Sequence, residues 1–212
     1  MTKVKICGIT SLDDALMAVE AGADALGFVF FEKSPRYLSP EVAARIIENI
    51  PPMVQVVGLF VNAELDFVNR TADSCGLDIV QLHGDESPAY CRLVRRRVMK
   101  AFRVRGPESL VSLADYRVAA YLLDAYSPNA YGGTGESFDW ECAAAAKEQG
   151  AIVLAGGLNP GNIALAVAKV APYAVDVSSG VESSPGCKDP EKVRRFIQEA
   201  KKAVPQAQKH RT

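Results

Sequence analysis

The amino-acid sequence predicts an α/β protein in which eight parallel strands close into one barrel surrounded by helices. Three observations predict this fold. Eight short, largely apolar segments recur along the chain, as is typical of strands buried on both faces. Stretches with helical start and stop signals separate them. The chain has 212 residues, 49% of them hydrophobic, which suits one domain with a full-sized core.

The predicted strands are rich in β-branched and large apolar residues. In chain order they are VKIC (4–7), ALGFVF (25–30), VQVVGLFV (54–61), DIVQLH (78–83), VMKAFR (98–103), AAYLLD (119–124), AIVLAG (151–156) and AVDVSS (174–179). A loop, a helix and a second loop fit between successive strands, so eight units predict a (β/α)8, or TIM, barrel. The alternative is a doubly wound open sheet. It favours a glycine-rich nucleotide turn after the first strand, and CGIT (7–10) is not one.

Two of the predicted helices have clear boundaries near the amino terminus. One begins after Ser11, a favourable N-cap residue, and ends at Gly22. Its expected buried stripe is Leu12, Ala15, Leu16 and Val19. The next begins at Ser39 and Pro40 and ends at Pro51. Its expected buried residues are Ile46, Ile47 and Ile50.

The last predicted helix begins at Asp189 and Pro190, a repeat of the Ser-Pro opening. Its expected buried residues are Val193, Phe196, Ile197 and Ala200. We see no linker, low-complexity segment or second domain. The sequence therefore predicts a barrel domain over residues 1–203 and a flexible carboxyl-terminal tail over 204–212.

Composition excludes several classes of function. The net charge is −1, so no global positive field favours nucleic acid or a membrane surface. No apolar run approaches the roughly 18 residues that a membrane span needs, and the amino terminus lacks a secretory signal pattern. The five cysteines are not spaced as disulfide or metal motifs. We expect reduced thiols, a cytoplasmic location and no bound metal.

Alternation along the strands places three polar residues inside the barrel. Lys5 and Cys7 share the inner face of the first strand, and Asp176 lies on that of the eighth. These strands are neighbours in a closed barrel, so we expect Lys5 to pair with Asp176 beneath Cys7. A cation there would favour the Cys7 thiolate, the form that accepts a proton. The alternative is that Cys7 is a small buried hydrophobic residue.

Asp124 is the second candidate proton-transfer group. It ends an otherwise apolar strand, where a carboxylate needs either solvent or a function. Because the carboxyl ends of parallel barrel strands meet at one face, Cys7 and Asp124 can face one substrate as a base and an acid. The alternative is an aspartate that only caps or starts a loop.

Glycine-bearing turns follow the seventh and eighth strands, AGGLNPGN (155–162) and DVSSGVESSPG (176–186). Turns at these positions of a barrel commonly bind phosphate through backbone N–H groups. A long glycine-rich loop, 125–139, follows the sixth strand, and it is either a lid over the phosphate or a surface loop.

Two further polar residues lie in loops on this face. Arg36 can bind a carboxylate or a phosphate in two parallel hydrogen bonds, and its alternative is a solvated surface residue. His83 ends the fourth strand on the inner face, where a turn residue is as consistent with the sequence as a catalytic one.

Nearly the whole chain resembles the phosphoribosylanthranilate isomerase family. The shared motifs, in order, are KICGIT, GFVF, SPR, GLFVN, QLHGDE, LLDA, GGTGESFDW, AGGLNPGN and DVSSGVE. The resemblance implies that Cys7 is the general base, Asp124 the general acid and Arg36 the ligand of the anthranilate carboxylate. It implies phosphate binding by Gly156, Gly157, Ser179 and Gly180, lid contacts near Gly133, Thr134 and Gly135, and pocket positions for His83 and Asp176.

The reaction that the resemblance implies is an Amadori rearrangement in tryptophan biosynthesis, without a cofactor or metal. Asp124 would protonate the ring oxygen of N-(5-phosphoribosyl)anthranilate, and Cys7 would then remove the C2 proton. This requires a protonated Asp124 and an ionised Cys7, the reverse of their ordinary order near ~3.9 and ~8.5. We therefore expect desolvation at Asp124 and positive charge near Cys7.

The expected partner is a small phosphorylated aromatic-amine sugar, and the resemblance also admits transient contact with neighbouring tryptophan-pathway enzymes. Two alternatives remain open. A related barrel of histidine biosynthesis would fit the phosphate turns. The resemblance to such barrels implies two aspartates as the acid and the base, so Cys7 argues against this alternative. A non-catalytic phosphate-binding barrel would not need Cys7, Asp124 and Arg36 together.

Overall fold

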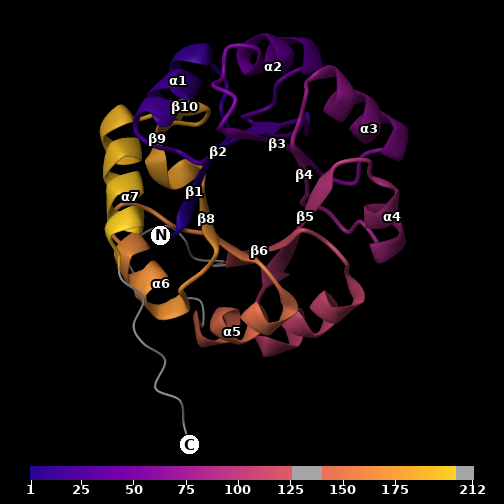
Figure 1. The fold of residues 1–212 in the computed structure, drawn as a ribbon, viewed down its shortest axis with the longest axis vertical. Coiled ribbons are helices and arrows are strands. Elements are labelled where there is room, and N and C mark those ends of the chain that lie inside the picture. Colours follow the sequence, from indigo (N-terminus) through magenta and orange to yellow (C-terminus); the bar gives the residue numbers. More distant parts are fainter. Residues whose placement is uncertain (126–139, 204–212) are drawn as a thin grey trace, which may run out of the picture.

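A computed structural model describes residues 1–125 and 140–203 of the chain, and its eight parallel strands close into a barrel (Figure 1). The strands are β1 (Lys3–Cys7), β2 (Ala25–Val29), β3 (Gln55–Phe60), β4 (Ile79–Leu82), β5 (Arg97–Val104), β6 (Ala120–Ala125), β7 (Ile152–Ala155) and β8 (Ala174–Val177). Each ends within two residues of its predicted end. Because β1 pairs in parallel with β8, the sheet is closed and the predicted fold is confirmed.

Helices cover the outside of the barrel. They are α1 (Leu12–Glu20), α2 (Pro40–Ile47), α3 (Leu65–Ser74), α4 (Pro88–Leu93), α5 (Trp140–Ala145), α6 (Ile163–Val170) and α7 (Pro190–Lys202). The fifth unit differs from the prediction, because its connection is the 3-10 helix η1 (Pro107–Asp115). Leu113 is buried there and Leu110 packs against the core, while Val111 is 77% exposed, so only a narrow apolar edge of the segment contacts the barrel.

The predicted helix starts are confirmed at all three sites. Ser11 and Ser39 each accept a hydrogen bond from the main-chain N–H three residues on, and Asp189 accepts two. The buried face of α1 was predicted in part: Ala15 is fully buried and Leu12 and Val19 pack against the core, but Leu16 is 41% exposed and Ala18 is fully buried instead. Small residues on this face let α1 lie close to the barrel.

Two apolar layers form the core. The larger one lies between the strands and the helices. The smaller one fills the barrel interior with Val57, Met99, Ala101, Leu122, Val153, Ala155 and Ala174. The barrel is therefore closed by side chains below the carboxyl ends of its strands.

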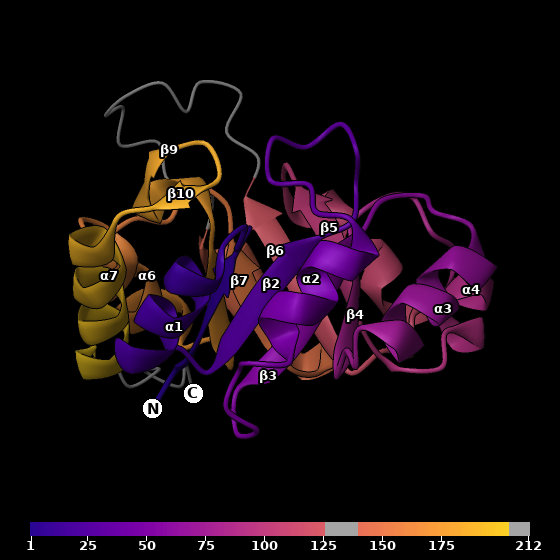
Figure 2. The same ribbon diagram turned by 90° about the horizontal axis from the view of Figure 1, so that it is seen from above.

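A hairpin extends the fold at this end. The short strands β9 (Glu182–Ser184) and β10 (Cys187–Lys188) follow the 3-10 helix η3 (Ser179–Val181) and pair antiparallel. Figure 2 shows the hairpin at the face where the strands end, with the amino terminus at the opposite face.

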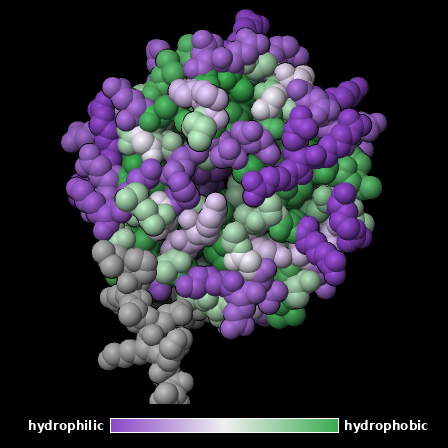
Figure 3. Space-filling view, in the orientation of Figure 1, coloured by the Kyte–Doolittle hydropathy of each residue, from purple (hydrophilic) through white to green (hydrophobic). Residues whose placement is uncertain are grey.

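The face of the molecule in Figure 3 is mainly polar. Hydrophilic residues cover much of the outer ring in Figure 3, with smaller hydrophobic areas between them. In residues 1–125 and 140–203, the helices are all too short or too polar to cross a membrane. The predicted tail, 204–212, lies outside the described residues.

Candidate active site

A cavity of about 370 Å³ opens at the carboxyl ends of the strands. It brings together every candidate site residue that the structure describes: Cys7, Arg36, His83, Asp124, Gly156, Gly157, Asp176, Ser179 and Gly180. These residues come from loops and strand ends of six different units, so only the closed barrel makes them neighbours. Gly133, Thr134 and Gly135 lie outside the described residues.

Cys7 is buried at the end of β1, against a glycine of the neighbouring strand. A Cβ atom at Gly27 would lie 2.8 Å from the sulfur of Cys7 and 3.0 Å from Nζ of Lys5. Atoms do not approach that closely, so Gly27 provides the space that both side chains occupy.

The predicted pair of Lys5 and Asp176 is confirmed. The two residues are in register across β1 and β8, and Lys5 Nζ donates to Asp176 Oδ1 at 2.9 Å. Both side chains are buried. Burial lowers the pKa of Lys5, but Asp176 and Cys7 together raise it by more, so the net shift is upward and Lys5 is a cation at neutral pH.

The expected effect of this cation on Cys7 is only partly correct. Lys5 does lower the pKa of the Cys7 thiol, and Lys188 also does so, but burial raises it by more. The net shift is upward, so this structure favours the thiol over the thiolate. The prediction was based on the charge of Lys5 alone, whereas desolvation of the buried sulfur also changes the pKa of Cys7.

Asp124 is joined to a short chain of hydrogen bonds. Its Oδ2 lies 3.2 Å from Nε2 of His83, and Nδ1 of His83 lies 3.0 Å from Nε2 of Gln81. The side chain of Asp124 is 32% exposed, so the described residues bury it less than the sequence argument required. His83 therefore contacts the candidate acid directly, which favours a functional role for it over that of a turn residue.

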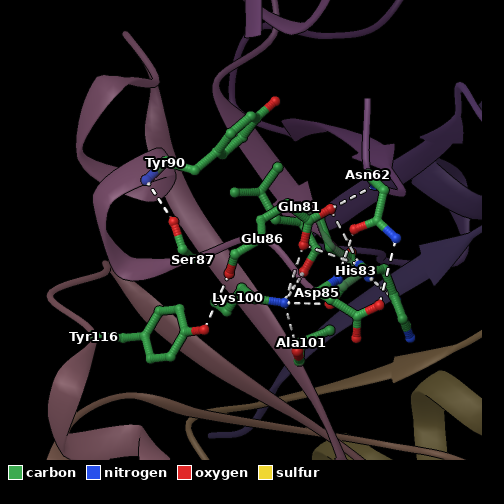
Figure 4. A network of polar contacts seen from close by, with 12 residues as sticks. Asn62, Gln81, His83, Asp85, Glu86, Ser87, Tyr90, Lys100, Ala101 and Tyr116 are labelled. Carbon is green, nitrogen blue, oxygen red and sulfur yellow. Dashed lines mark hydrogen bonds and ion pairs between the residues drawn. The ribbon is translucent and has the colours of Figure 1, made fainter. Parts of the chain in front are cut away.

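A buried network holds the loop that carries His83 (Figure 4). Glu86 accepts hydrogen bonds from the main-chain N–H groups of Asn62 and Gly84, and it pairs with Lys100 at 3.1 Å. Lys100 also donates to the carbonyl of Gly84 at 2.7 Å. Both charged side chains are buried, so the network fixes the backbone immediately after His83.

The two phosphate-turn candidates have backbones that require glycine. Gly156 and Gly157 have φ values of +87° and +63°, in the left-handed region. A Cβ at Gly180 would lie 1.9 Å from the carbonyl oxygen of Leu158, so the two turns are packed directly against each other. Residues of both turns line the same cavity.

Sequence reasoning missed three polar residues of the site. The hydroxyl of Ser178 lines the cavity, is buried and has no hydrogen-bond partner among the described residues. Glu182 and Lys188 are buried beside Arg36 and Cys7. The position of Glu182, a charged residue soon after the eighth strand, could have marked it as a candidate. Its contact with Arg36 could not be predicted in this way, because Arg36 lies in a distant loop. In the parts of the chain that the structure describes, no group of three residues has the composition of a metal site.

Known proteins match the chain over nearly its full length. The model of the N-(5'-phosphoribosyl)anthranilate isomerase family matches residues 4–199. The isomerase of Citrifermentans bemidjiense is 83% identical over 202 residues, which cover 95% of this chain and 98% of that protein. The isomerase of Geobacter sulfurreducens is 64% identical over 95% of this chain and 99% of its own.

Solved structures agree with these relatives. The crystal structure of phosphoribosyl anthranilate isomerase from Thermotoga maritima superposes with a TM-score of 0.89 at 48% identity, over 95% of this chain and 99% of that one. A phosphoribosyl anthranilate isomerase in complex with reduced 1-(o-carboxyphenylamino)-1-deoxyribulose 5-phosphate gives 0.87 at 45% identity, with the same coverage. The chain belongs to the N-(5'-phosphoribosyl)anthranilate isomerase family.

Proposed function

We propose that this protein converts N-(5'-phosphoribosyl)anthranilate to 1-(2-carboxyphenylamino)-1-deoxyribulose 5-phosphate in tryptophan biosynthesis. Membership of the family supports the reaction. The single observation that supports its assignment to this site is the cavity, which holds Cys7, Asp124, Arg36 and the two glycine turns together. A histidine-pathway isomerase and a non-catalytic barrel are both less consistent with this family and this set of residues.

The substrate has two anionic groups, and the cavity has a candidate anchor for each. The phosphate fits the turns around Gly156 and Gly180, where backbone N–H groups bind anions well. The anthranilate carboxylate fits the guanidinium of Arg36. Held at both ends, the sugar would lie across the strand ends that carry Cys7 and Asp124.

The chemistry begins at the furanose ring. Asp124 donates a proton to the ring oxygen, the bond from that oxygen to C1 breaks, and the amine nitrogen and C1 form a Schiff base. His83 is the hydrogen-bond partner of Asp124 and holds its carboxyl group in place. The ring oxygen leaves as a hydroxyl group on C4.

The second step moves a proton from carbon. Cys7 accepts the proton of C2, the electrons of that C–H bond form a C1–C2 double bond, and the electrons of the C1–N double bond move to nitrogen. The resulting enolamine becomes the ketone when C1 gains a proton and the C2 hydroxyl group loses one. Burial raises the pKa of Cys7 and so opposes the thiolate that this step needs. Lys5 is the group that lowers this pKa most. No step calls for a cofactor, so we also propose that the reaction is cofactor-independent. We further propose that it takes place in the cytoplasm and that it allows transient contact with neighbouring pathway enzymes.

Loss of anthranilate-type fluorescence from N-(5'-phosphoribosyl)anthranilate measures the proposed activity. We expect wild-type protein to remove the fluorescence and Cys7→Ala and Asp124→Asn each to lower kcat at least ~10²-fold, because each removes one proton-transfer group. Cys187→Ala, at an exposed cysteine, should keep wild-type kcat. An inactive wild type contradicts the function, and full turnover by both site variants contradicts the mechanism.

A further inference from the structure

The guanidinium of Arg36 is held by a carboxylate of this chain. Its Nε and Nη2 atoms donate to the two oxygens of Glu182 at 2.8 Å and 2.6 Å. The side chain of Glu182 is buried, whereas that of Arg36 is 21% exposed and lines the cavity. One partner of this ion pair therefore belongs to the protein interior and the other to the binding site.

The aliphatic part of Arg36 is fixed as well. A Cβ atom at Gly8 would lie 2.5 Å from Cδ and 3.2 Å from Cγ of Arg36, so the arginine chain lies directly over this glycine. Gly8 also has a φ of +77°, which favours glycine. Because Gly8 follows Cys7, the candidate carboxylate anchor is packed onto the same turn as the candidate base.

Glu182 has a second cation on its other side. Lys188, its cross-strand neighbour in the β9–β10 hairpin, donates to Glu182 Oε1 at 2.7 Å and to the carbonyl of Cys7 at 2.6 Å. The Lys188 side chain is fully buried. Glu182 thus joins Arg36 through Lys188 to the end of β1, and the hairpin fixes the guanidinium relative to Cys7.

The charge on Glu182 agrees with the geometry, whereas burial lowers the pKa of its partner Lys188. Burial raises the pKa of Glu182, but hydrogen bonds from Arg36 and Lys188 together lower it by more, so the residue is a carboxylate at neutral pH. Only a carboxylate can accept from Arg36 at both oxygens while it also accepts from Lys188, since a glutamine side chain has a single acceptor oxygen.

The way that Glu182 is bound decides which part of the guanidinium remains available. Its contacts use the edge of Arg36 formed by Nε and one N–H of Nη2. Within residues 1–125 and 140–203, the contacts of Arg36 leave the end of the guanidinium formed by one N–H of Nη1 and one of Nη2 able to form two parallel hydrogen bonds with a second carboxylate. We infer that Glu182 is a positioning residue that aims this edge of Arg36 at the carboxylate of the substrate. This inference rests on the role proposed for Arg36.

Two ligands test it: reduced 1-(o-carboxyphenylamino)-1-deoxyribulose 5-phosphate and the same compound without its carboxyl group. Calorimetry gives the ratio of their dissociation constants, the carboxylate preference. We expect Glu182→Gln to lower this preference at least about tenfold, because a misaligned guanidinium forms fewer charge-assisted hydrogen bonds. Binding of the compound without a carboxyl group should change less than about twofold, since its phosphate anchor is untouched.

Matched variants separate this inference from the proposed role of Arg36. Arg36→Met should lose the preference, and Glu191→Gln, the same substitution at an exposed site on α7, should keep it. If Arg36→Met keeps the preference, the role of Arg36 and the inference both fail. If Arg36→Met loses it and Glu182→Gln keeps it, the inference alone fails.

A merely structural role for Glu182 has its own signature. Glu182→Gln would then weaken both ligands equally, which overturns the inference. If this variant does not fold, Glu182→Gln combined with Lys188→Met removes both buried charges, so neither is left unpaired. The double variant should show the same loss of carboxylate preference, and an unchanged preference in it overturns the inference.

Discussion

Single residues in this barrel show burial and charge acting in opposite directions. Cys7 lies beside a buried cation, yet the desolvation of its sulfur outweighs that cation, and the net shift of its pKa is upward. Lys5 keeps its charge because Asp176 lies 2.9 Å away. The buried ion pair thus keeps a cation next to the sulfur at a depth where an isolated ammonium would lose its proton.

Lys5→Met tests this balance. Lys5 lowers the pKa of Cys7, so its removal should raise that pKa further. The midpoint of Cys7 alkylation by iodoacetamide should move to higher pH, and kcat should fall. The measurement uses a Cys187→Ser background, because the exposed Cys187 would also react. Lys3→Met changes an exposed lysine of the same strand and should leave the midpoint where it is. A midpoint unmoved by Lys5→Met would show that Lys5 does not control the thiol.

At the scale of elements, the turns after the strands are held by buried polar contacts as well as by apolar packing. The loop after β4 depends on Glu86, whose carboxylate accepts from two main-chain N–H groups and pairs with Lys100. The hairpin after β8 depends in the same way on Glu182 and Lys188. Each carboxylate is buried, so we expect each loop to lose its conformation when the charged partner is removed.

Glu86→Gln should destabilise the fold by about 3–5 kcal/mol, because it leaves the buried ammonium of Lys100 without its carboxylate. Urea unfolding followed by circular dichroism measures the change. Glu86→Gln combined with Lys100→Met removes both charges and should recover part of the loss. The exposed pair of Arg95 and Asp73 is the matched comparison, and Arg95→Ala should cost less than about 1 kcal/mol. Equal costs for Glu86→Gln and Arg95→Ala would contradict the importance of burial.

At the scale of the whole molecule, one carboxylate connects the first strand to the last helix. Asp24 accepts from Lys3 and from the main chain of Val4 on β1, and it pairs with Lys201 at the end of α7. Lys201 also donates to the carbonyl of Gly22. Lys201 lies in the last turn of α7, and only the closed fold brings it to these partners.

Acid should weaken this closure. Partial burial raises the pKa of Asp24, but hydrogen bonds from Lys3 and Lys201 outweigh it, so the pKa in the folded state is lowered. A lowered folded-state pKa stabilises the fold above the unfolded value near ~3.9, and that stability is lost as the pH falls through the folded-state pKa. Asp24→Asn should therefore reduce stability at pH 7 and flatten its dependence on pH below about 4.5. Thermal unfolding across pH measures both effects, and an unchanged acid slope would contradict them.

The repeating pattern of the chain was enough to predict the fold. Each strand needs one apolar segment, and each of the confirmed helix starts needs one capping residue, so both are properties of neighbouring residues. The pair of Lys5 and Asp176 also followed from local alternation once the barrel was closed. The fifth unit was mispredicted, because a 3-10 helix and an α-helix share the same local signals and differ in how they pack.

The sequence by itself determined the closed eight-stranded barrel and many of the residues that line one cavity. Only the tertiary structure decided how those residues are held and charged. Glu182 meets Arg36 across 146 positions of the chain, and Lys188 meets Cys7 across 181. Burial of the Cys7 sulfur depends on the surrounding strands in the same way. Hydrogen bonds and desolvation depend on distances in the folded state, and a linear pattern of residue types does not contain those distances.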